Sequence, residues 1–124
     1  MPEKKILIID DDHRNVFALS AVLKAKGYTC LSALGMKEAF ILLNKEKDIS
    51  IILLDMMMPD LDGYQSIPLI RNHETAGHVP IIAVTAQAMK GDRERCLEAG
   101  ADEYISKPVN IDELLKAMEG LIKS

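Results

Sequence analysis

The chain lacks tryptophan, and aromatic residues make up only 4% of its 124 residues. A core must therefore be built from aliphatic side chains and methionine, which are plentiful because hydrophobic residues reach 48%. This content excludes a disordered chain, and the length favours a single domain over residues 1–124. The sequence has no run of about eighteen apolar residues, so we expect no transmembrane helix and no membrane contact through this domain.

Cysteine is also scarce, with two residues, and the 19 acidic residues outnumber the 15 lysines and arginines. Residues 1–6 carry lysines but no long apolar segment follows them, so we expect no signal peptide and a cytoplasmic location. In that compartment Cys30 and Cys96 are expected to be reduced thiols. The net charge of −4 and the pI near 5.3 argue against direct nucleic-acid binding.

Short apolar runs alternate with segments of helical spacing along the chain. Strands are predicted over residues 6–9, 28–33, 51–54, 81–84 and 103–106, and helices over 15–26, 35–47, around 67–70, over 89–99 and after 110. Runs that are apolar throughout are typical of strands buried on both faces. This alternation predicts the α/β class, with five β-α units, a doubly wound parallel sheet and the flavodoxin-like strand order 2-1-3-4-5.

A few positions bear on the helix ends. Asp62 can cap the helix that follows it, and Asn110 with Glu113 forms a capping box. Pro68 lies inside a predicted helix and should kink or shorten it. Residues 72–80 are mostly polar and predict a surface loop.

Polar residues follow four of the predicted strands at the point where each strand ends. They are Asp10, Asp11 and Asp12, then Asp55, then Thr85, then Lys107 with Pro108. In open α/β sheets the site lies outside the carboxyl ends of the strands, so these residues should share one pocket. Several carboxylates, a hydroxyl and an ammonium suit a hard divalent cation and a phosphoryl group.

The acids alone allow two interpretations. Adjacent carboxylates repel one another, and a bound Mg²⁺ would remove that repulsion because it prefers oxygen ligands and is commonly held by one or two carboxylates with water and phosphate oxygens. Acids at a helix start can instead simply complement the helix dipole. The second interpretation accounts for Asp11 or Asp12 but not for Asp55, which follows another strand.

Asp55 can likewise be a solvated acid at a strand end or a phosphoryl acceptor that forms an aspartyl phosphate. In the second case Mg²⁺ on one side and Lys107 on the other would neutralise the incoming group. Thr85 offers a donor for a phosphoryl oxygen, although alone it is an ordinary β-branched strand residue.

These residues, together and in this order, resemble the receiver domain of bacterial two-component response regulators, including the chemotaxis regulators. The likeness rests on Ile6–Asp12, Leu54–Pro59 with Asp62–Gly63, Val84–Ala86 and Lys107–Pro108, and it covers essentially the whole chain. The segment from 78 to 89 is similar to receivers of hybrid histidine kinases.

The resemblance implies a role for each site residue. Asp55 would accept a phosphoryl group from the phosphohistidine of a histidine kinase or a histidine phosphotransfer protein. Asp11, Asp55 and the backbone carbonyl of Met57 would bind Mg²⁺ directly, and Asp10 would act through a bound water. Lys107 would pair with Asp55 and then with the phosphoryl group, and its bond to the following proline is often cis in this family.

The resemblance also implies a switch in place of a turnover enzyme. Thr85 would move toward the phosphoryl oxygens and Tyr104 would turn inward behind it, changing the face formed by residues 89–99, 103–106 and the last helix, where a downstream protein would bind. The domain would catalyse only its own phosphorylation and dephosphorylation. Met57 and Gln87 would flank the hydrolytic water, and because Met57 cannot orient a water we expect slow to moderate self-dephosphorylation.

Other classes of function remain open at this point. An Mg²⁺-dependent phosphohydrolase is the main alternative, because Asp10–Asp12 contains an Asp-x-Asp pattern. Such enzymes have Thr or Val two residues after this pattern, whereas this chain has Arg14 there. An interaction module without phosphorylation would not need the complete acid, threonine and lysine set. A flavin-binding domain of the same fold would need hydroxyls and amides in the first loop, where this chain has acids.

Overall fold

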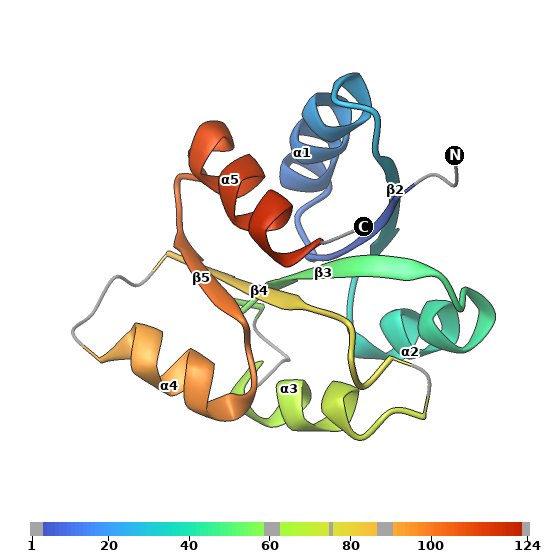
Figure 1. Cartoon of the computed structure of the whole chain (residues 1–124), viewed down its shortest axis with the longest axis vertical. Helices are drawn as coiled ribbons and strands as arrows, with labels where there is room; N and C mark the ends of the chain where they lie inside the picture. The colour runs from blue at the N-terminus through green and yellow to red at the C-terminus, as the bar shows by residue number, and fades with distance from the viewer. Residues whose placement is uncertain (1–3, 59–62, 75, 87–90, 123–124) are drawn as a thin grey trace.

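The computed structural model describes residues 4–58, 63–74, 76–86 and 91–122, along which five strands alternate with five helices (Figure 1). The elements in chain order are β1 (Lys5–Ile9), α1 (His13–Ala25), β2 (Thr29–Ala33), α2 (Met36–Lys45), β3 (Ile49–Asp55), α3 (Gly63–Arg71), β4 (Ile81–Thr85), α4 (Asp92–Ala99), β5 (Glu103–Ser106) and α5 (Ile111–Leu121). Each predicted strand is present, with its ends within two residues of the prediction.

The strands form one parallel sheet in the order β2-β1-β3-β4-β5, which confirms the predicted topology. Helices α1 and α5 cover one face, and α2, α3 and α4 cover the other (Figure 1). The direction of winding reverses at β1, because the chain first adds β2 on one side and then β3 on the other. Ile9 pairs with Leu54, so the ends of β1 and β3 are adjacent at the switch point of the sheet.

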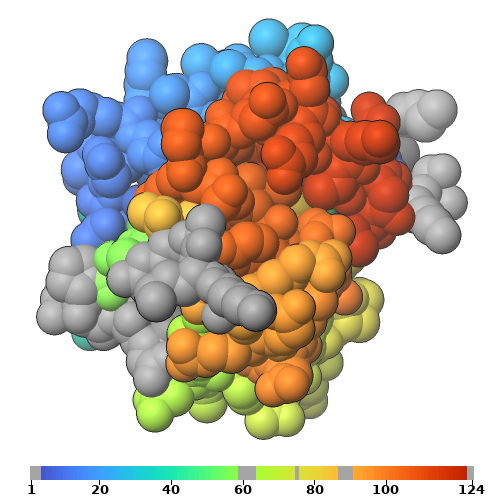
Figure 2. All heavy atoms as spheres, turned by 90° about the vertical axis from the view of Figure 1, so that its left-hand side faces the viewer, coloured from blue at the N-terminus to red at the C-terminus, as the bar shows by residue number. Residues whose placement is uncertain are grey.

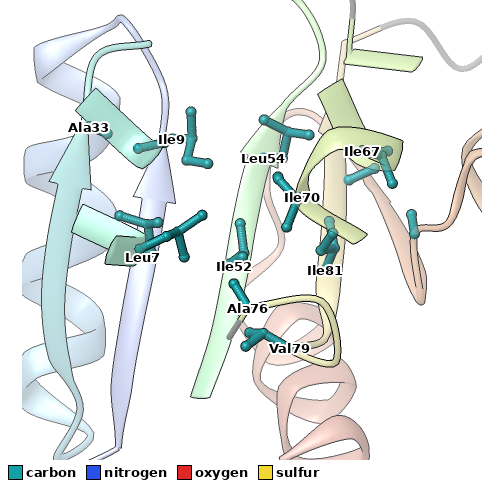
Figure 3. Close-up of a cluster of buried hydrophobic side chains, with 14 of the residues drawn as sticks. Leu7, Ile9, Ala33, Ile52, Leu54, Ile67, Ile70, Ala76, Val79 and Ile81 are labelled. Atoms are coloured by element: carbon teal, nitrogen blue, oxygen red, sulfur yellow. The ribbon is translucent and has the colours of Figure 1, made fainter. Parts of the chain in front are cut away.

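The neighbouring strands β1 and β3 are buried on both faces. Residues Ile6–Ile9 and Ile51–Leu54 are at most 2% exposed. In β1, Ile6 and Ile8 pack beneath α1 and α5. Leu7 and Ile9 pack on the opposite face, in the cluster drawn in Figure 3. Burying one such side chain contributes about 1.5–3 kcal/mol, so both faces select apolar residues and no polar alternation is seen.

The segment between α3 and β4 contributes two side chains to the core. Ala76 and Val79 are each 4% exposed and lie in the same cluster as Ile52 and Ile70 (Figure 3). The prediction of a surface loop over residues 72–80 is therefore wrong for these two residues. Isolated apolar residues in a polar stretch have no periodicity, so the sequence pattern did not indicate their burial.

Arg71, the last residue of α3, ties this segment to the connection between α4 and β5. Its guanidinium donates two hydrogen bonds to the Gly100 carbonyl and one each to the carbonyls of Gly77 and Val79, at 2.6–3.1 Å. A further hydrogen bond goes to the carboxylate of Asp102 at 2.5 Å. One side chain therefore satisfies carbonyl groups on two separate loops.

The helix starts differ from the prediction at two places. α1 begins at His13, before the predicted residue 15, because the Asp12 side chain accepts a hydrogen bond from the Arg14 N–H at 3.0 Å and caps the helix. α4 begins at Asp92 in the structure. The predicted start of this helix at residue 89 lies outside the described residues, as does the predicted cap Asp62.

Pro68 and the cap of the last helix can be compared directly with the prediction. Pro68 is exposed and lies inside α3, a helix of nine residues. The helix continues beyond Pro68, and the Asn72 N–H donates a hydrogen bond to the Pro68 carbonyl at 3.0 Å. The predicted cap of α5 is confirmed, because the Asn110 side chain accepts a hydrogen bond from the Glu113 N–H at 2.9 Å.

Cys30 and Cys96 are both free, and they pack against core clusters on opposite faces of the sheet. Within the described part of the chain, every helix is too short or too polar to cross a bilayer.

Candidate functional site

Figure 2 is a view onto the edge of the sheet where the carboxyl ends of the strands lie. The start of α1, the segment after β3, the end of β4 and the segment between β5 and α5 meet at this edge, although they are far apart in the sequence. The predicted convergence of the four polar positions is therefore present in the structure.

Three carboxylates form the centre of the site. Asp10 follows β1 and is 2% exposed, Asp55 ends β3 and is 5% exposed, and Asp11 is exposed beside them. One carboxylate oxygen from each of the three lies within 4.8 Å of the others. Asp12 is not part of this group, and its side chain caps α1 instead.

Asp10 is held by two hydrogen bonds from its own loop and helix. The Asp12 N–H donates to Oδ1 at 2.9 Å, and Nδ2 of Asn15 donates to Oδ2 at 2.5 Å. Buried carboxylates need such donors because burial removes their water. Asn15 is absent from the predicted site, and the only signal for it in the sequence is an amide residue in the first turn after the acids.

Asp55 lies between positive and negative neighbours. Its Oδ1 accepts a hydrogen bond from the Met57 N–H at 2.9 Å, and its Oδ2 lies 3.4 Å from Nζ of Lys107. Burial raises the pKa of the Asp55 carboxyl, and the nearby Asp10 carboxylate raises it further, while the Met57 N–H and the Lys107 ammonium act in the opposite direction. The net result is a raised pKa, and burial is its largest cause.

Lys107 and Thr85 are placed by the pairing of β4 with β5. Thr85 pairs with Ser106, and the Lys107 N–H donates to the Thr85 carbonyl at 2.8 Å. Thr85 is 5% exposed, and the Lys107–Pro108 bond is cis, as the resemblance implied. The side chain of Lys107 can therefore reach Asp55 from the next strand but one.

Tyr104 pairs with Ala83, two strand positions before the pair of Thr85 with Ser106, and is half-buried against the core beneath α4. Burial raises the pKa of its phenol, and the nearby Asp92 and Cys96 side chains add to the effect. Behind it, β5 and α5 line an open groove of about 480 Å³ bordered by Glu103, Lys116 and Leu121. Tyr104 also lines this groove, so it lies on the face formed by α4, β5 and α5.

The donor set fits Mg²⁺. The three clustered ligand groups are all carboxylates, which are the hard oxygen donors that this ion prefers. Ionised carboxylates gathered within 4.8 Å repel one another, and a bound cation would relieve this repulsion. A soft-metal site would instead require thiolates or imidazoles, and none belongs to this cluster among the described residues.

An acidic pocket at the switch point of a parallel α/β sheet, with the lysine after β5 paired to one of its acids, is the arrangement that the sequence resemblance to receiver domains predicted. The chain matches the response regulator receiver domain over residues 6–119, and it belongs to that family. Members of this family work in two-component phosphorelay signalling and are generally not turnover enzymes. The predicted family and fold are thus confirmed.

The most similar relatives include a large kinase and a small regulator. Hybrid signal transduction histidine kinase I of Dictyostelium discoideum is 40% identical over 116 residues, which is 89% of this chain but only 7% of the kinase. The polar-differentiation response regulator DivK of Brucella ovis is 31% identical over 119 residues, which is 96% of each chain. Similar sequences therefore occur both as small proteins and as parts of kinases.

Solved structures show the same arrangement. The receiver domain of sensor histidine kinase PA1611 from Pseudomonas aeruginosa PAO1 superposes with a TM-score of 0.86 at 35% identity, covering 99% of this chain and 100% of that one. It was crystallised with a magnesium ion coordinated in its active-site cleft. The signal receiver domain from Bermanella marisrubri gives a TM-score of 0.86 at 31% identity, covering 98% and 100% of the two chains.

Proposed function

We propose that this domain is a phosphorylation-controlled switch in which Asp55 accepts a phosphoryl group from the phosphohistidine of a histidine kinase or a histidine phosphotransfer protein. The observation that carries the proposal is the environment of Asp55: a nearly buried carboxylate with the Lys107 ammonium 3.4 Å away and two further acids within 4.8 Å. A buried acid with this surplus of negative charge is poorly suited to a purely structural role. It is well suited to a reaction that requires a cation.

In the reaction, an oxygen of Asp55 forms a bond to phosphorus while the bond from phosphorus to the histidine nitrogen breaks. The electron pair of that bond stays on the nitrogen, which takes up a proton from solvent. Lys107 neutralises charge on the phosphoryl oxygens from its position beside Asp55. Bound Mg²⁺ would be held by Asp11, Asp55 and the backbone carbonyl of Met57, and by Asp10 through water, and it would supply the remaining neutralisation.

Two observations support Mg²⁺ as the cation. The carboxylate oxygens are gathered within 4.8 Å, and the similar receiver domain of PA1611 has a magnesium ion in its active-site cleft. The site needs little rearrangement to bind such an ion, because the backbone N–H of Asp12 and the side chain of Asn15 already orient Asp10.

Phosphorylation would act on the protein through Thr85 and Tyr104. A new dianion on Asp55 favours a position of the Thr85 hydroxyl closer to the phosphoryl oxygens, and Tyr104 then turns inward behind it. The hydrogen bond from the Lys107 N–H to the Thr85 carbonyl couples the two strand ends during this change. The altered surface is the face of α4, β5 and α5, where a downstream protein would bind.

We propose that the phosphorylated state decays slowly to moderately. The Met57 side chain is 40% exposed beside Asp55 and has no group that can orient an attacking water. The other residue expected to flank this water, Gln87, lies outside the described residues.

We further propose that residues 1–124 act as one domain in the cytoplasm, without direct contact to nucleic acid or membrane. The net charge of −4 supports the absence of a nucleic-acid partner, because phosphate backbones bind basic surfaces.

The test is incubation with acetyl phosphate and Mg²⁺, followed by mass spectrometry of the intact protein. We expect an added mass of one phosphoryl group, which disappears in Asp55→Asn and persists in Asp12→Asn, a matched change of an acid outside the cluster. Labelling that survives in Asp55→Asn would contradict the proposal. Continuous turnover of many small phosphate esters would favour the phosphohydrolase alternative instead.

A further inference from the structure

Asn15 is the one amide side chain, among the described residues, that donates to an acid of the site. It lies in the first turn of α1, and its Nδ2 is 2.5 Å from Oδ2 of Asp10. The Asp12 N–H holds the other oxygen, Oδ1, at 2.9 Å. Both oxygens of a carboxylate that is 2% exposed therefore have protein donors.

The two donors differ in what they depend on. The Asp12 N–H is a backbone group that any residue would supply at this turn, whereas the donor to Oδ2 exists only because residue 15 is an asparagine. One hydrogen bond leaves a carboxylate free to rotate about its terminal torsion, which has a broad energy profile. Two hydrogen bonds on opposite oxygens fix the plane of Asp10 relative to Asp11 and Asp55.

We propose that Asn15 is a positioning residue for the cation site: it orients Asp10 so that the three carboxylates can serve one Mg²⁺ together. This inference rests on the proposed function and deepens it. Groups that orient metal-binding residues without touching the metal typically change affinity by roughly 10- to 100-fold when removed. Loss of the Asn15 amide therefore weakens Mg²⁺ binding and raises the Mg²⁺ concentration needed for phosphorylation.

A role in the stability of α1 alone does not account for asparagine here. Asp12 already caps the helix, and asparagine forms helices less well than leucine or alanine. Asn15 also borders an apolar groove with Ala18 and Val109, so a leucine of similar size has room. Asn15→Leu therefore keeps the helix and the side-chain volume while it removes the donor, and the unpaired Oδ2 of Asp10 should lower the free energy of unfolding.

The experiment compares Asn15→Leu and Asn15→Ala with wild type and with Arg14→Ala. Arg14 is the neighbouring residue of α1, and its side chain is 95% exposed, so it is a matched control. The dissociation constant for Mg²⁺ is measured by calorimetric titration, and the half-saturating Mg²⁺ concentration and limiting rate by acetyl phosphate labelling. Urea unfolding in EDTA checks that each variant is folded.

We expect a dissociation constant roughly 10-fold higher for both Asn15 variants, the low end of the range for groups that orient metal ligands, because Asp10 would reach the ion through water. The half-saturating concentration should rise in proportion while the limiting rate changes less, and Arg14→Ala should match wild type in each measurement. Wild-type affinity in folded Asn15→Leu would overturn the inference, as would an equal loss in Arg14→Ala. The proposed function fails by a different result, namely wild-type protein that binds Mg²⁺ but is not phosphorylated on Asp55.

Discussion

Replacing Asp55 with asparagine should stabilise the metal-free protein. The folded state holds the Asp55 carboxylate in a buried position close to Asp10, and its pKa is raised for that reason. Asparagine has nearly the shape of aspartate and can still accept the hydrogen bond from the Met57 N–H, but it carries no charge. The acid that we assign to phosphoryl transfer should therefore lower the stability of the resting protein.

The magnitude follows from the distance between the acids. Two unit charges 4.8 Å apart repel by about 1 kcal/mol in a water-like medium and by about 3.5 kcal/mol at an effective dielectric constant of about 20. The Lys107 ammonium, 3.4 Å from Asp55, offsets part of this repulsion. We expect a net gain of about 1 kcal/mol, which shifts the midpoint of urea unfolding upward by about 0.5 M.

The gain should depend on pH with a defined sign. Because the pKa of Asp55 is raised on folding, the folded state binds this proton more tightly than the unfolded chain does. The penalty is absent below the ordinary aspartate pKa of about 4 and develops as pH rises through the higher folded pKa. Between about pH 4 and the folded pKa of Asp55, the free energy of unfolding of wild type should fall relative to that of Asp55→Asn. At higher pH the difference in free energy between the two proteins should stay constant.

The assay is urea unfolding followed by circular dichroism in EDTA, with Asp12→Asn as the control. Asparagine caps helices as well as aspartate does, so this control should change stability little. Saturating Mg²⁺ should reduce or reverse the advantage of Asp55→Asn, because wild type alone has the complete carboxylate set. A less stable Asp55→Asn in EDTA, or an advantage that Mg²⁺ leaves unchanged, would refute the electrostatic argument.

Three further changes test other parts of the structure. Lys107→Ala removes the ammonium 3.4 Å from Asp55 and should slow labelling by acetyl phosphate by roughly 100-fold, measured by mass spectrometry. Met57→Asn supplies a group that can orient water and should speed decay of the phosphorylated protein severalfold, measured after removal of the donor. Arg71→Ala removes the guanidinium that bonds two loops and should lower the free energy of unfolding by about 3 kcal/mol, measured by urea unfolding.

Each of these has a control and a contradicting result. Lys116→Ala, an exposed lysine of α5, should label at the wild-type rate, and equal slowing in both lysine variants would count against a specific role for Lys107. Unchanged decay in Met57→Asn would remove the reason for a long-lived phosphorylated state. Full stability in Arg71→Lys would show that the forked geometry of the guanidinium is not required.

The strands and the main acids were predictable because they depend on rules that act locally. Ile6–Ile9 and Ile51–Leu54 are apolar throughout, which is the pattern of strands buried on both faces. Asp10 and Asp55 follow those strands directly, so the topology rule for parallel sheets was enough to bring them together. The same rule brought Lys107 to this edge of the sheet, and its pairing with Asp55 was implied by the resemblance to receiver domains.

The features that were missed depend on side-chain direction or on contacts between distant segments. Asn15 reaches Asp10 only because Asp12 caps α1 and so sets where the first turn lies. The hydrogen bonds of Arg71 reach Gly100 and Asp102, which lie 29 and 31 residues further along the chain, and a single sequence has no signal for such contacts. Val79 is buried for a related reason, since its partners in the core come from other elements.

The central claim is that Asp55 accepts a phosphoryl group from a nitrogen atom. The most direct measurement uses phosphoramidate, a small donor with a phosphorus–nitrogen bond, together with Mg²⁺, followed by peptide mapping by mass spectrometry. We predict one phosphoryl group per chain, located on Asp55 and absent when EDTA replaces Mg²⁺. A phosphoryl group on another residue, or no labelling of folded protein that binds Mg²⁺, would contradict the account.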